Sequence, residues 1–252
     1  MFFKIILFSF IEGLTEFIPI SSTGHLIILD HFVSLSKNTQ FTHAFSVIIQ
    51  LGAILAVLVY FKDKIFSLKK EDILKILVAV IPAAILGLLF DDIIDHYLFN
   101  IYVVSSFLII YGIILLYIEK IKFNKSILEF KNITYKVAFF IGAFQTLALI
   151  PGTSRSAATI IGAMILGLDK ILAIEFSFFL AIPTMLGASG LKILKLPILS
   201  LSEYMYILLG FVFSYIFAYI FIKFFMKYIK GHDFKLFAYY RIILGLVILI
   251  IL

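Results

Sequence analysis

"EGLTEFIPISSTGH", residues 12–25, interrupts an apolar stretch rich in Phe, Ile and Leu. Pro19 and the polar residues around it break this stretch near its middle, so the stretch cannot form one continuous spanning helix. A second stretch, residues 137–168, is broken in the same way at "PGTSRSAAT", residues 151–159. The two interruptions predict two broken helices that dip into a membrane and return to the side from which they entered.

The composition is that of an integral membrane protein. Hydrophobic residues make up 63% of the chain and charged residues 14%, against roughly 25% charged residues in soluble domains. The apolar runs are continuous and do not alternate with polar residues, which favours helices over a barrel. Runs long enough to span recur at 41–61, 73–90, 101–118, 171–191, 204–222 and 237–252. We therefore predict an all-α polytopic membrane protein, a single integral membrane domain over residues 1–252, with about six transmembrane helices and two re-entrant broken-helix hairpins.

The lysines predict the topology. They cluster in three connections, which should be cytoplasmic: Lys62, Lys64, Lys69 and Lys70; Lys120, Lys122, Lys125, Lys131 and Lys136; Lys223, Lys227, Lys230 and Lys235. The connections near 31–40, 91–100 and 192–203 hold few cations and should be outside. The second of them is expected to be a solvated loop that contains Asp91, Asp92, Asp95 and His96, and the third contains Lys192 and Lys195. The net charge of +6 thus reflects topology, and no nucleic-acid partner is expected.

The two broken stretches resemble each other. Aligning Pro19 with Pro151 pairs "IPISST" with "IPGTSR", and "AFSVIIQLGAILA" at 44–56 then pairs with "EFSFFLAIPTMLG" at 175–187. The charge pattern makes one copy enter from outside and the other from inside, which indicates an inverted-topology repeat. We place the repeat halves at roughly 1–118 and 119–252, with the two tips facing each other in the interior.

The first tip carries two acids on one helix face. Glu12 and Glu16 are four residues apart, so they lie one helical turn from each other. They could snorkel or cap the helix, but a bound divalent cation or a pair with Arg155 accounts better for acids at this depth. Carboxylates with hydroxyl and phosphate oxygens suit Mg²⁺ or Ca²⁺.

Hydroxyls and a histidine follow the break. They lie at the start of a helix and form either an anion site or an ordinary N-cap: Ser21, Ser22, Thr23, Gly24 and His25. His25 is either a hydrogen-bonded core residue or a base, acid or phosphate acceptor.

The second tip carries Arg155, with apolar sequence on both sides. A guanidinium matches phosphate oxygens bidentately, although Arg155 could simply neutralise Glu12 or Glu16. Further donors surround it: Gly152, Thr153, Ser154 and Ser156. Gln50 and Glu175, in the paired helices, either line the same cavity and bind substrate or hydrogen-bond between helices. We expect Arg241 to anchor the last helix at the cytoplasmic interface.

Both motifs resemble those of the undecaprenyl-pyrophosphate phosphatases of bacteria, also called bacitracin-resistance proteins, and "IQLGAILAV" and "EFSFFLAIP" fit as well. The resemblance implies hydrolysis of undecaprenyl diphosphate to undecaprenyl phosphate and phosphate, which recycles the lipid carrier for cell-wall synthesis and confers bacitracin resistance. It also implies a divalent-metal requirement and a multi-pass protein of the cytoplasmic membrane whose site opens to the outer face. A homo-oligomer is compatible with it.

The resemblance also implies roles. Glu12 and Glu16 would bind the metal and tune the nucleophile, Arg155 would hold the pyrophosphate, and Ser22 or His25 would attack the terminal phosphorus. The main rival is a flippase for the same lipid, because inverted repeats are a transporter device; a second, the type-2 phosphatidic acid phosphatase class, is rejected. The latter class needs a histidine shortly beyond its Ser-Arg, and residues 156–168 contain none.

Overall fold

The computed structural model describes residues 1–121, 126–194 and 198–252, without the side chains of Asp91, Asp92 and Asp95. The predictions that fall on those three side chains and on Lys122, Lys125 and Lys195 therefore lie outside the described residues.

The described chain is built of helices and contains no β-strand. The first half comprises α1 (Phe2–Thr15), α2 (Ser22–Phe32), α3 (Thr39–Tyr60), α4 (Lys62–Ser67), α5 (Lys70–Tyr97) and α6 (Ile101–Lys120). The second comprises η1 (Phe130–Asn132), α7 (Tyr135–Gln145), η2 (Thr146–Leu149), α8 (Arg155–Ile165), α9 (Lys170–Ile193), α10 (Leu201–Ile229) and α11 (Lys235–Ile251).

The prediction of an all-α polytopic membrane protein is confirmed. Among the described residues, five helices are long and apolar enough to cross a membrane: α3, the Lys70–Phe90 part of α5, α6, α9 and α10. The predicted sixth span, α11, is apolar but shorter, at 17 residues. The predicted outer connection at 91–100 is also shorter than expected, because α5 continues to Tyr97.

Each broken stretch is a hairpin whose two ends meet. Lys4, in the first turns of α1, donates a hydrogen bond to the carbonyl of Ser34 beyond the end of α2. Ile127, before α7, exchanges backbone hydrogen bonds with the segment beyond α8, at 3.0 Å to Gly167 and 3.0 Å from Asp169. Both hairpins are therefore re-entrant, as the sequence predicts.

The three basic connections lie at one end of the molecule. Lys170 Nζ donates to the carbonyl of His232 at 2.6 Å, and Lys75 Nζ donates to that of Lys131 at 3.1 Å. These contacts join the beginning of α9 to the α10–α11 connection, and the beginning of α5 to η1. At the opposite end, the Asn38 amide donates to Glu203 at 2.7 Å. The first hairpin opens toward this second end and the second hairpin toward the basic end, so the repeat is inverted.

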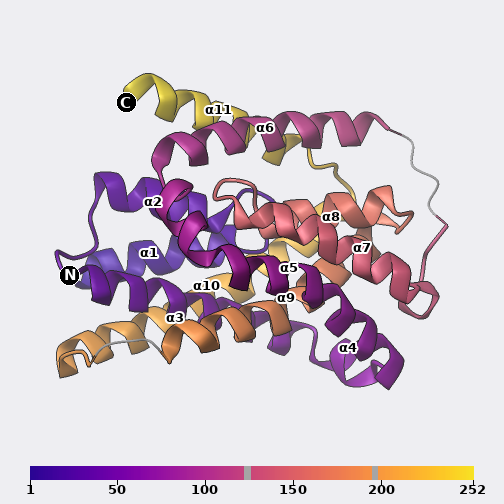
Figure 1. Ribbon diagram of the computed structural model, residues 1–252, viewed down its shortest axis with the longest axis horizontal. Coiled ribbons are helices and arrows are strands. Elements are labelled where there is room, and N and C mark those ends of the chain that lie inside the picture. Colours follow the sequence, from indigo (N-terminus) through magenta and orange to yellow (C-terminus); the bar gives the residue numbers. More distant parts are fainter. Residues whose placement is uncertain (122–125, 195–197) are drawn as a thin grey trace.

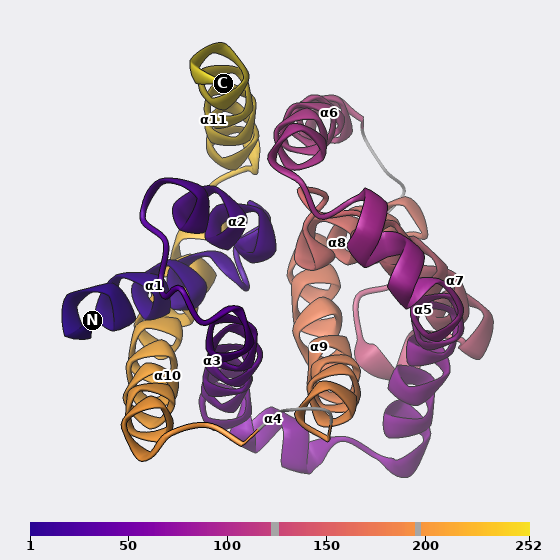
Figure 2. The same cartoon turned by 60° about the vertical axis from the view of Figure 1, so that its left-hand side comes forward.

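The halves interlock. Figure 1 and Figure 2 show α6 and α11 lying side by side along one edge, and Figure 2 shows α3 and α9 between α10 and α5. The first helix of each hairpin packs on a long helix of the other half, α1 on α10 and α7 on α5. A Cβ at Gly13 would lie 2.7 Å from the backbone nitrogen of Ala218, and so the glycine lets α1 approach α10 closely. This exchange brings the tips after α1 and η2 together.

Candidate active site

The two tips turn at equivalent serines. Ser21 and Ser154 have φ of 74° and 75°, and they are the described non-glycine residues with positive φ. Each caps its helix: Ser21 Oγ accepts from Gly24 N at 3.3 Å, and Ser154 Oγ accepts from Ala157 N at 3.2 Å.

This equivalence corrects the register of the repeat. Ser154 lies one residue beyond the position that pairing Pro19 with Pro151 assigns to Ser21. In the corrected register Ser22 and Arg155 are counterparts, because each is the first residue of its helix, α2 or α8.

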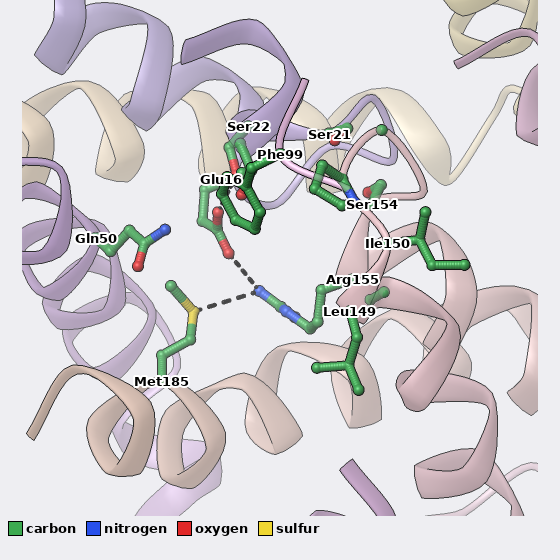
Figure 3. Close-up of a pocket in the computed structure, with 14 residues that line it drawn as sticks. Glu16, Ser21, Ser22, Gln50, Phe99, Leu149, Ile150, Ser154, Arg155 and Met185 are labelled. Carbon is green, nitrogen blue, oxygen red and sulfur yellow. Dashed lines mark hydrogen bonds and ion pairs between the residues drawn. The ribbon is translucent and has the colours of Figure 1, made fainter. Parts of the chain in front are cut away.

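A pocket lies between the tips, and Figure 3 shows its lining. It brings together eight of the residues that the sequence singles out: Glu16, Ser21, Ser22, Thr23, Gln50, Gly152, Ser154 and Arg155. The remaining lining residues are mostly apolar: Phe99, Ala148, Leu149, Ile150, Pro151 and Met185. The pocket lining therefore combines polar residues from both halves with apolar residues.

Glu16 joins the two counterparts. Its Oε1 accepts from Arg155 Nη2 at 2.8 Å, the ion pair dashed in Figure 3. Its Oε2 accepts a hydrogen bond from the Ser22 hydroxyl. Arg155 is held further by Nη1, which donates to the carbonyl of Ser177 at 3.0 Å, and by the Phe17 ring at 5.7 Å. A carboxylate so placed can accept the proton of the serine hydroxyl.

Glu12 lies one turn before Glu16 and is completely buried. Neither of its carboxylate oxygens has a hydrogen-bond partner among the described residues. A buried carboxylate with both oxygens unpaired is costly unless a cation or a proton accompanies it. In the described part of the chain, no three or more His, Cys, Asp or Glu side chains are grouped so that they could hold a metal ion by themselves. A cation held here would thus need oxygen ligands from hydroxyls or substrate besides the two glutamates.

His25 is not among the residues that line the pocket. Its Nδ1 lies 2.7 Å from the carbonyl of Ser21, and its Nε2 lies 2.8 Å from the hydroxyl of Tyr240 in α11. The two rings are stacked, with centroids 5.6 Å apart. Both ring nitrogens are therefore engaged in contacts that hold the first tip against α11.

Other predicted substrate-binding residues also lie outside the pocket lining. Gly24 packs close to Val104 of α6, and the Ser156 hydroxyl donates to the carbonyl of Ile18 at 3.2 Å, which links the tips. Glu175 forms an ion pair with Lys64 near the basic end. The expectation that Glu175 faces the cavity is therefore not met, because α9 turns this side chain toward α4.

Comparison with known proteins identifies the family. Residues 5–247 match the family described as Bacitracin resistance protein BacA. The chain belongs to this family. It is 49% identical to Undecaprenyl-diphosphatase 1 of Clostridioides difficile (strain 630), over 98% of this chain and 94% of that protein. It is 45% identical to an undecaprenyl-diphosphatase of Enterococcus faecalis, over 98% and 96%, and 47% identical to that of Fusobacterium nucleatum, over 98% and 99%.

The site of this BacA family member includes a residue whose role the sequence prediction misassigned. Arg241 of α11 is fully buried, so the prediction that it anchors at the membrane interface is wrong. Its guanidinium donates to the carbonyls of both tips and to that of Phe107 in α6. A signal was present, because Arg241 is flanked by apolar and aromatic residues on both sides. Thr153, fully buried, offers its carbonyl to Arg241 and does not line the pocket.

Proposed function

We propose that this protein hydrolyses undecaprenyl diphosphate to undecaprenyl phosphate and inorganic phosphate, which returns the lipid carrier to peptidoglycan synthesis and confers bacitracin resistance. The observation that carries the proposal is the position of Glu16 between the Ser22 hydroxyl and the Arg155 guanidinium in a pocket. A nucleophile, its base and an anion-binding group therefore meet at one point. The relatives named as undecaprenyl-diphosphatases support the same reaction.

Ser22 is the nucleophile in this proposal, because its hydroxyl lies in the pocket and already donates to a carboxylate. Glu16 accepts the hydroxyl proton while Ser22 Oγ forms a bond to the terminal phosphorus. The bond between that phosphorus and the bridging oxygen breaks, and undecaprenyl phosphate leaves with the bonding electrons. His25 is a weaker choice because contacts outside the pocket engage both its nitrogens.

The second step reverses the roles of the serine and its base. Protonated Glu16 returns its proton to Ser22 Oγ as the Oγ–phosphorus bond breaks, while the oxygen of a water molecule bonds to the phosphorus and one water proton passes to a phosphate oxygen. The serine recovers its proton and phosphate is released. Arg155, whose Nε is buried and lacks a partner in the described chain, neutralises charge on the phosphate oxygens in both steps.

We also propose that a divalent cation, Mg²⁺ or Ca²⁺, binds beside the pocket. Glu12 and Glu16 would hold it, since the unpaired oxygens of Glu12 are the kind of ligand a hard cation takes. When bound, such an ion neutralises phosphate charge.

We further propose that the protein resides in the bacterial cytoplasmic membrane with the pocket open to the outer face. Phe99, from the α5–α6 connection, lines the pocket while its side chain is 44% exposed. The positive-inside rule places the basic connections in the cytoplasm. The α5–α6 connection lies at the opposite end of the molecule and is therefore outside. The apolar residues of the lining suit the start of a polyprenyl chain.

Phosphate release tests the function. Purified protein in detergent should release phosphate from undecaprenyl diphosphate with Mg²⁺, and Glu16→Gln should abolish release. Glu129→Gln is the matched control, because Glu129 is exposed in a connection at the basic end, and it should leave the rate unchanged. Binding of the lipid without phosphate release in Mg²⁺ or Ca²⁺ would instead favour a flippase.

A further inference from the structure

Arg241 ties the two tips to one side chain. Its Nη1 donates to the carbonyl of Pro19 at 2.9 Å, and its Nη2 donates to those of Gly152 at 2.7 Å and Thr153 at 2.9 Å. The guanidinium also lies 5.7 Å from the Tyr111 ring centroid. Among the described residues, every hydrogen-bond partner of this guanidinium is a backbone carbonyl. A buried cation matched only by carbonyl dipoles is expensive to maintain, which argues for a specific purpose.

The bond to Thr153 has a consequence on the opposite side of the peptide plane. In a planar trans peptide, the C=O of one residue and the N–H of the next point in opposite directions. The Thr153 carbonyl faces Arg241, so the Ser154 N–H faces away from it. Ser154 lines the pocket, and its N–H donates no hydrogen bond within the described residues. This N–H is thus free to bind an anion there.

We propose that Arg241 is a positioning residue: it fixes the Thr153–Ser154 peptide so that the Ser154 N–H faces the diphosphate. It also holds the first tip, through Pro19, at a fixed distance from the second tip. The proposal rests on the proposed function and deepens it. Arginine suits this task better than lysine, because the fork reaches Pro19 in one tip and Gly152 and Thr153 in the other at once.

Arg241→Lys and Arg241→Gln test the proposal. For Arg241→Gln we expect kcat to fall about 100-fold, the loss typical of one misplaced oxyanion donor, and for Arg241→Lys we expect a smaller fall. The inhibition constant of inorganic pyrophosphate should rise as well, and lysine should retain more activity than glutamine. Tyr239→Leu is the matched control, because Tyr239 precedes Arg241 on an exposed face of α11. It should change neither constant.

Two outcomes overturn the proposal. If Arg241 serves only overall stability, Vmax falls with the folded fraction while KM and the pyrophosphate inhibition constant stay unchanged. If it serves neither, both variants are fully active. Hydrogen exchange separates the proposal from the proposed function: loss of Arg241 should speed exchange at residues 16–25 and 149–158 and leave the α3–α10 interface unchanged, whether or not phosphate is released. If Arg241→Gln does not fold, Arg241→Lys decides.

Discussion

The tip after α1 and the tip after η2 turn at serines of nearly equal φ, and each presents the first residue of a helix to the same pocket. They differ in what that residue is, a hydroxyl at Ser22 and a guanidinium at Arg155. They differ also in what precedes it, because Glu16 belongs to the first tip and Leu149 and Gly152 to the second. The comparison teaches that one backbone device, used twice in opposite orientations, supplies the nucleophile from one half and the anion-binding group from the other.

Removing the Ser22 hydroxyl, which the first tip contributes to the site, should have the largest effect on activity. Ser22→Ala should lower kcat by at least about 1,000-fold, because no other hydroxyl in the pocket donates to Glu16 among the described residues. Ser202→Ala, in an exposed turn of α10, is the control. Phosphate release by Ser22→Ala at a tenth of the parent rate or more would show that the nucleophile lies elsewhere.

Changing the guanidinium tests the second tip. Arg155→Lys keeps the charge but loses the fork that bonds Glu16 and Ser177 together, so kcat/KM should fall about 100-fold. Steady-state phosphate release at several lipid concentrations measures this change. An unchanged kcat/KM would mean that only the charge matters at this position.

A methyl group at Gly152 tests the backbone of the second tip. Gly152 has φ of +94°, and a Cβ there would lie 2.5 Å from the carbonyl oxygen of Val104. Gly152→Ala should therefore cost about 1–3 kcal/mol locally and reduce activity by roughly tenfold as the loop shifts. Gly231→Ala, with no atom within 4 Å of the added carbon, should retain the parent's melting temperature and rate. Equal melting temperatures for both variants would contradict the steric argument.

The contact between the first tip and α11 should matter least. Tyr240→Phe removes the hydroxyl that meets His25 Nε2 and leaves Ser22, Glu16 and Arg155 in place. We expect a loss of no more than about tenfold in kcat, the worth of one neutral hydrogen bond. A loss as large as that of Ser22→Ala would place His25 in the chemistry.

Much of the fold and part of the site follow from the sequence. The spans, the inverted hairpins and the meeting of Glu16, Ser22 and Arg155 follow from apolar runs, lysine placement and two polar breaks. The shift of register at Ser154 does not follow from the sequence. It depends on the positive φ of Ser21 and Ser154, which the residue type serine does not predict.

Contacts between segments that are distant in the chain could not be predicted from the sequence either. Glu175 pairs with Lys64 because of the way α9 is rotated about its axis. Arg241 and Tyr240 reach the tips only once α11 packs along α6. Periodicity alone fixes neither the rotation nor the packing of helices so far apart in the chain.

The most direct test of the divided site is to trap the phosphorylated enzyme with undecaprenyl diphosphate labelled at the terminal phosphate and to map the label. The absence of cysteine in the chain keeps thiol phosphorylation out of the result. We expect the label on Ser22 in the parent and on no residue in Ser22→Ala. Label on His25 in the parent would contradict the assignment of the nucleophile to the first residue of α2.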